Sequence, residues 1–142
     1  MIKRILNSRL PLMVMTPVKV FDVKYFDAVY AAGALPVFDT EFLSEENILA
    51  HINELSGQQF SFGVRLAEYN RELIRKIKAV KQANLDLLEV PVDAGSSASD
   101  LDDFGATRIV LEIRDINVNE TIEQIGPHAL ILKGNEAGGR VS

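Results

Sequence analysis

Short apolar runs recur along the chain at intervals of roughly 21 to 26 residues, the length of a strand plus a crossover helix. They are mostly apolar rather than alternating, which is typical of strands covered on both faces in a parallel sheet. The pattern therefore predicts six β/α units. The runs are residues 12–15, 35–38, 60–64, 87–90, 109–111 and 129–132.

The segments between the runs predict helices. Asp22 and Ser44 are expected N-caps, because each precedes residues whose apolar positions fall on one helical face. Gly33 is expected to supply a left-handed end to the first helix. Three further helices are predicted: one from about residue 70, a weak one before residue 105, and one from residue 117 or 119 to residue 125.

The chain has 142 residues, 47% of them apolar, and no linker divides it. One domain over residues 1–142 is therefore expected. An open doubly wound sheet usually has a glycine-rich turn after its first strand, but residues 15–18 contain no glycine. The preferred fold is α/β, the first six β/α units of a (β/α)8 TIM-type barrel. This incomplete barrel should have consecutive parallel strands.

Net charge and composition limit the classes of partner that the chain is expected to bind. The formal net charge of −5 argues against binding to nucleic acid or to an anionic membrane. No apolar stretch reaches membrane-spanning length, no metal-ligand spacing appears, and cysteine is absent. His51 is expected to be solvent-exposed near the polar face of the second helix, and both His51 and His128 are interpreted as structural. These features predict a cytoplasmic protein with a small-molecule or protein partner.

Polar residues stand at or just after almost every predicted strand, where parallel folds bind ligands. Glu89 and Glu112 lie inside apolar runs, so one interpretation is a structural ion pair with Arg65 or Arg114. The other interpretation is that the polar residues at the strand ends together form a ligand site. These residues are Thr16, Asp39, Arg65, Glu89, Asp93, Glu112, Arg114, Lys133 and Glu136.

Three segments carry a family resemblance: residues 14–17 (VMTP), 62–66 (FGVRL) and 131–140 (ILKGNEAGGR). The chain resembles FMN-dependent nitronate monooxygenases (2-nitropropane dioxygenases) and related enoyl reductases, and most closely their variants in polyketide synthases. In this resemblance, Arg65 occupies the position of a family asparagine and Lys133 that of a family glutamine, and both of those family residues contact the flavin. Arg140 replaces the histidine usually assigned to catalysis, so no catalytic residue is assigned.

The resemblance implies an FMN-dependent oxidoreductase-like domain acting on a small-molecule substrate, within a larger polyketide synthase chain. Its implied cofactor-binding residues are Thr16, Arg65, Lys133, Gly138 and Gly139. The Lys133 ammonium should stabilise the negative charge of a reduced flavin. Two alternatives stay open: a truncated, non-catalytic barrel module that associates with a larger synthase, and a doubly wound small-ligand-binding domain.

An incomplete barrel has two further consequences. Barrels of this type commonly anchor phosphate after strands seven and eight, so this chain alone is expected to bind FMN poorly. Its first and sixth strands should also have unpaired edges. Self-association is therefore expected unless a partner covers them.

Overall fold

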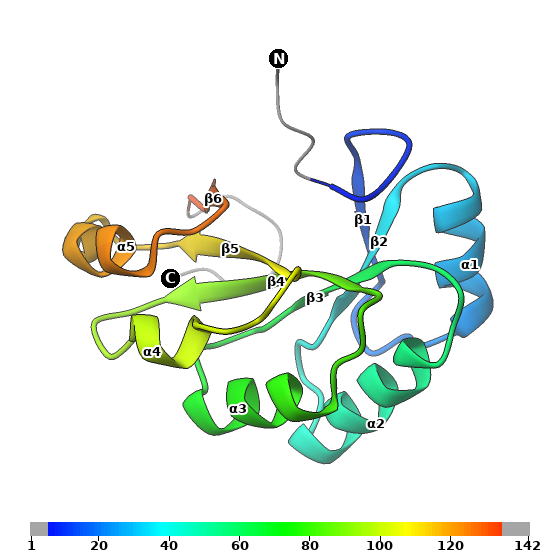
Figure 1. Ribbon diagram of the computed structural model, residues 1–142, viewed down its shortest axis with the longest axis horizontal. Helices are drawn as coiled ribbons and strands as arrows, with labels where there is room; N and C mark the ends of the chain where they lie inside the picture. The colour runs from blue at the N-terminus through cyan, green and yellow to red at the C-terminus, as the bar shows by residue number, and fades with distance from the viewer. Residues whose placement is uncertain (1–5, 135–142) are drawn as a thin grey trace.

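Strands and helices alternate along the chain and form one curled parallel sheet with helices on its outer side (Figure 1). The computed structural model describes residues 6–134. The strands are β1 (Met13–Met15), β2 (Leu35–Asp39), β3 (Phe62–Arg65), β4 (Leu85–Val92), β5 (Arg108–Ile113) and β6 (Ala129–Leu132). The helices are α1 (Val23–Ala31), α2 (Glu45–Ser56), α3 (Arg71–Val80), α4 (Ala98–Leu101) and α5 (Asn119–Ile125), with a 3₁₀ turn η1 (Ile116–Val118) before α5.

The strand order confirms the predicted winding. Neighbours follow the sequence order β1 to β6, and each adjacent pair is parallel. A doubly wound sheet requires the order to reverse at a switch point. That alternative is therefore wrong, and the curled sheet corresponds to part of a barrel. Within residues 6–134, β1 and β6 each have only one neighbouring strand.

Local capping explains where the first three helices begin. Asp22 Oδ1 accepts a hydrogen bond from the Lys24 N–H at 2.9 Å, and Ser44 Oγ accepts one from the Asn47 N–H at 3.3 Å. Asn70 caps α3 in the same way. Gly33 adopts φ +100° just after α1, as predicted, in a region that other residues rarely enter.

The two faces of the sheet pack differently. The outer face and the helices share the larger core, which includes Phe26, Ile52 and Ile77 from α1, α2 and α3. The inner, concave face carries a smaller cluster whose buried members all come from strands. Its buried members are Leu35, Val37, Leu87 and Val110, with Leu6, Met13, Ala129 and Ile131 packed against them. This apolar layer lies beneath the polar strand ends described below.

The chain's own N-terminal segment packs against the amino end of the concave face. Leu6 contacts the apolar layer, and the Asn7 N–H donates to Asp86 Oδ2 at 2.9 Å. Asp86 sits where β4 has an extra residue opposite β3, and it also pairs with Arg108. Sequence patterns did not predict this polar group, because its partners are 79 residues apart in the chain.

Asn84 joins the loop after α2 to the start of β4. Its Nδ2 donates to the backbone carbonyls of Leu55, Gln58 and Phe60, at 3.0, 3.2 and 3.1 Å. We expect Asn84→Ala to lower the free energy of unfolding by about 2 kcal/mol, because partly buried carbonyls lose their donor. Urea denaturation followed by circular dichroism checks this. The control, exposed Asn47→Ala, should change stability by less than about 0.5 kcal/mol, and an equal effect of both variants would contradict the prediction.

The helices of the described part of the chain are too short and too polar to cross a bilayer.

Candidate functional site

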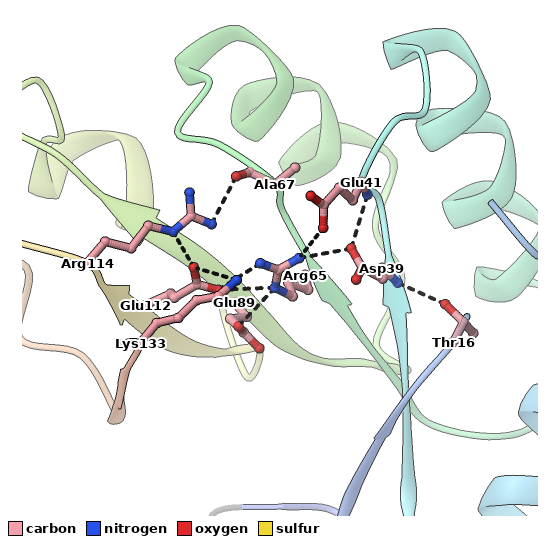
Figure 2. Close-up of polar contacts among 9 residues, drawn as sticks. All are labelled: Thr16, Asp39, Glu41, Arg65, Ala67, Glu89, Glu112, Arg114 and Lys133. Atoms are coloured by element: carbon pink, nitrogen blue, oxygen red, sulfur yellow. Dashed lines mark hydrogen bonds and ion pairs between the residues drawn. The ribbon is translucent and has the colours of Figure 1, made fainter. Parts of the chain in front are cut away.

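A buried arginine occupies the carboxyl end of the sheet. Arg65 is the last residue of β3, its side chain is 4% exposed, and four carboxylates surround it (Figure 2). Its Nη1 lies 3.1 Å from Asp39 Oδ1 and 3.5 Å from Glu41 Oε2. Its Nε lies 3.4 Å from Glu89 Oε1, and its Nη2 lies 3.0 Å from Glu112 Oε2. We call these five residues, with Arg114 and Lys133, the ion cluster.

Strand register explains how the ion cluster assembles. Asp39 on β2, Arg65 on β3 and Glu89 on β4 are register partners on successive parallel strands, so their side chains leave the sheet on the same face. A turn then brings Glu41 back toward Arg65, because Asp39 Oδ1 accepts a hydrogen bond from the Glu41 N–H at 3.0 Å. Glu112 reaches the same guanidinium from β5.

Glu112 connects three cations. Besides Arg65, it pairs with Arg114, whose Nη2 also donates to the Ala67 carbonyl at 3.2 Å. Lys133, just beyond β6, places its Nζ 3.8 Å from Glu112 Oε1. The interpretation of Glu89 and Glu112 as ion-pair partners of Arg65 and Arg114 is therefore confirmed.

The predicted site residues within the described chain lie at this end of the sheet. Arg65 and Lys133 meet at Glu112, and Thr16 joins through Asp39, whose N–H donates to Thr16 Oγ1 at 3.0 Å. Both cations are largely buried: the Arg65 side chain is 4% exposed and the Lys133 side chain 9%. Gly138 and Gly139 lie outside the described residues.

Asp93, another member of the predicted polar set, does not join the ion cluster. Asp93 is exposed and organises its own turn, accepting a hydrogen bond from the Gly95 N–H at 2.8 Å. Glu136 lies outside the described residues. Glu41, in contrast, belongs to the ion cluster although it is absent from the predicted polar set. Its position two residues after Asp39 could have indicated this, because a tight turn there returns a side chain to the strand end.

Burial and neighbouring charges shift the pKa values of Glu89 and Glu112 in opposite directions. Burial, the hydrogen bond to Glu112 and the nearby carboxylates raise the pKa of Glu89 to about 7. Burial alone would raise the pKa of Glu112 as well, but Arg114 and Arg65 lower it below its ordinary value. Burial likewise opposes the charge on Arg65, yet Asp39 and Glu112 raise the pKa of its guanidinium. Near neutral pH, Glu112 is ionised while Glu89 titrates.

The arrangement therefore combines a fixed guanidinium, a carboxyl group that titrates near neutrality and a lysine held by one long contact. A cavity of about 240 Å³ lies beside it, between the loops that follow β2 and β3. Its lining includes Thr40, Glu41, Phe42 and Leu66. In the described residues, no group of three or more His, Cys, Asp or Glu side chains is placed to hold a metal ion.

Both histidines lie away from the ion cluster. The His51 ring stacks on Phe21 with centroids 3.8 Å apart and meets Phe38 edge-on, so the expectation that it is solvent-exposed needs correction. His128 Nδ1 accepts a hydrogen bond from the Ile109 N–H at 3.1 Å and so helps to align β6 with β5. Both contacts are structural.

No protein-family model matches this chain, and no curated protein matches it either. The geometry of the ion cluster, together with the residue resemblance, is therefore the basis on which its function is inferred.

Proposed function

We propose that this chain forms the first six β/α units of a (β/α)8 barrel of the FMN-dependent nitronate monooxygenase and enoyl reductase type. FMN would bind on the concave face at the carboxyl ends of the strands. One observation supports this above others: Arg65 and Lys133 stand on the same face at the same end of the sheet and meet at Glu112. Cations on opposite faces of the sheet could not both contact one ligand.

The residues present fit this cofactor in part. Lys133 Nζ has one carboxylate neighbour within the described chain, at 3.8 Å, so its ammonium keeps donors for an anionic group. Thr16 Oγ1 accepts from Asp39 and keeps its hydroxyl hydrogen to donate. Arg65 fits less well, because four carboxylates occupy its guanidinium. We assign it to positioning the strand ends, and Lys133 to direct contact.

Bound FMN would supply the redox chemistry, and Lys133 would tune it. An ammonium beside the ring stabilises the negative charge of the reduced form, whereas an amide offers only a dipole. We expect Lys133→Gln to retain flavin but to lower its reduction potential, measured by spectroelectrochemistry on FMN-loaded protein that contains all eight β/α units. The control is exposed Lys24→Gln in α1. An unchanged potential in Lys133→Gln would remove this role.

FMN binding itself is tested by NMR on the 142-residue chain, since that method detects weak binding. Adding FMN should shift the amide resonances of Thr16, Asp39 and Lys133, at one end of the sheet. Those of Asn7 and Asp86, at the opposite end, should stay in place. Shifts confined to the amino end, or none with FMN at millimolar concentration, would refute the proposed site.

A second candidate function, a non-catalytic module that docks onto a larger synthase, is favoured by a different observation. Within residues 6–134, β1 and β6 have open edges, and residues Leu130 and Leu132 are 49% and 80% exposed. Such edges are normally covered. Failure to bind FMN, combined with stoichiometric assembly onto a synthase polypeptide, would favour this function over the first.

A further inference from the structure

The charges of the ion cluster do not balance when every group is ionised. Asp39, Glu41, Glu89 and Glu112 supply four carboxylates. Arg65, Arg114 and Lys133 supply three cations within the described chain. An uncompensated charge is costly in a buried site, and a carboxyl group there keeps its proton instead. One bound proton makes the ion cluster neutral.

Geometry indicates which carboxyl group holds that proton. Glu89 Oε1 and Glu112 Oε2 flank the same Arg65 Nε, at 3.4 and 3.1 Å, which brings two like charges together unless one is neutral. Among the residues that the structure describes, Glu112 has three cationic neighbours, whereas Glu89 has only Arg65. The Glu89 side chain is 1% exposed, and its Oε2 has no hydrogen-bond partner in the described part of the chain. Glu89 is therefore the group that is least able to bear a charge.

Lys133 is the cation with freedom to respond. Arg65 is enclosed by four carboxylates, and Arg114 is fixed by Glu112 and the Ala67 carbonyl. Within residues 6–134, Lys133 Nζ instead stands 3.8 Å from its nearest carboxylate oxygen, beyond hydrogen-bond distance. A new negative charge on Glu89 would attract this ammonium most readily.

We propose that the ion cluster is a one-proton switch: Glu89 holds the proton at mildly acidic pH, and its release draws the Lys133 ammonium inward. The groups that face Glu89 come from four neighbouring parts of the sheet. They are Asp39 and Glu41 at the end of β2, Arg65 on β3, Glu112 and Arg114 at the end of β5, and Lys133 after β6. The pKa of Glu89, raised to about 7, puts the transition near neutral pH.

The bound proton should be visible by infrared spectroscopy of the chain labelled with ¹³C-glutamate. At pH 6 we expect the C=O band of about one protonated glutamic acid, and this band should disappear by pH 8. It should be absent from Glu89→Gln and present in the control Glu123→Gln, an exposed position on α5. Absence of the band from the wild type at pH 6, or its persistence in Glu89→Gln, would overturn the proposal.

The response of Lys133 is measured separately. Its backbone N–H donates to the Ile113 carbonyl at 3.0 Å, so its amide resonance reports on movement at the end of β6. This resonance should titrate with the infrared band in the wild type and in Glu123→Gln. A Lys133 resonance that stays constant while the band disappears would show a bound proton without a switch.

Stability gives a test that needs no spectroscopic label. The folded pKa of Glu89 lies above its unfolded value, so folding takes up a proton between about pH 4.5 and 7 and stability falls as pH rises through that range. The unfolding equilibrium constant should rise up to tenfold per pH unit. The lowered pKa of His51 acts in the opposite direction, so the measure is the difference between wild type and Glu89→Gln, which both keep His51, across this range. The control Glu123→Gln keeps Glu89 and should follow the wild type, whereas Glu89→Gln should lose the rise; a rise of equal size in Glu89→Gln would contradict the proposal.

Discussion

Replacing Arg65 with methionine is expected to cost at least about 3 kcal/mol of unfolding free energy, and to unfold the chain outright where its margin is smaller. Methionine approximates the length of the side chain but leaves Asp39, Glu41, Glu89 and Glu112 without their shared counter-ion. Removing one partner from a buried ion pair is far more harmful than replacing the whole group. Urea denaturation at pH 6 measures the loss.

Two companion variants make this prediction specific. Arg75→Met, on the exposed side of α3, removes a guanidinium whose nearest carboxylates are 3.9 Å away, and it should cost less than about 1 kcal/mol. Arg65→Lys keeps the charge but loses the planar fork, so its stability should lie between those of the wild type and Arg65→Met. Equal stability of Arg65→Met and Arg75→Met would show that Arg65 does not hold the strand ends together.

The purified 142-residue chain is expected to self-associate at micromolar concentration. Open strand edges present unpaired N–H and C=O groups, and Leu130 and Leu132 add exposed apolar surface on the outer side of β6. The double substitution Leu130→Lys and Leu132→Lys should weaken association about tenfold or more, because charged side chains on an edge strand oppose pairing. Analytical ultracentrifugation over a concentration series measures the change.

The control for association is Val20→Lys, which puts the same charge on an exposed apolar position in the loop before α1. This variant should associate as the wild type does. A wild-type chain that stays monomeric throughout the micromolar range would show that the edge of β6 does not mediate self-association.

The strands and most helix ends could be predicted because their causes are local. Apolar runs at regular spacing specify the parallel strands, and Asp22 and Ser44 accept the hydrogen bonds from the first helical turns that their side chains predict. The weakly predicted helix before residue 105 has only four residues, Ala98–Leu101, because few apolar side chains are available there to pack it against the core.

The ion cluster could be predicted only in outline. Polar residues at strand ends indicated where a site lies, and Asp39, Arg65 and Glu89 are register partners. However, no local pattern encodes that one guanidinium meets four carboxylates, because that depends on the curl of the sheet and on the turn that returns Glu41. The same limit applies to Asn7 and Asp86, whose contact depends on the path of the N-terminal segment across the sheet.

The consecutive strand order has a consequence for the sequence of events during folding. Each adjacent strand pair joins segments separated by one helix, so pairs such as β2 with β3 need only modest loop closure and can form early. The contact between Arg65 and Glu112 spans 47 residues and requires β3, β4 and β5 to be aligned first. We therefore expect the ion cluster to form late, with its charged groups kept in water until the sheet has curled.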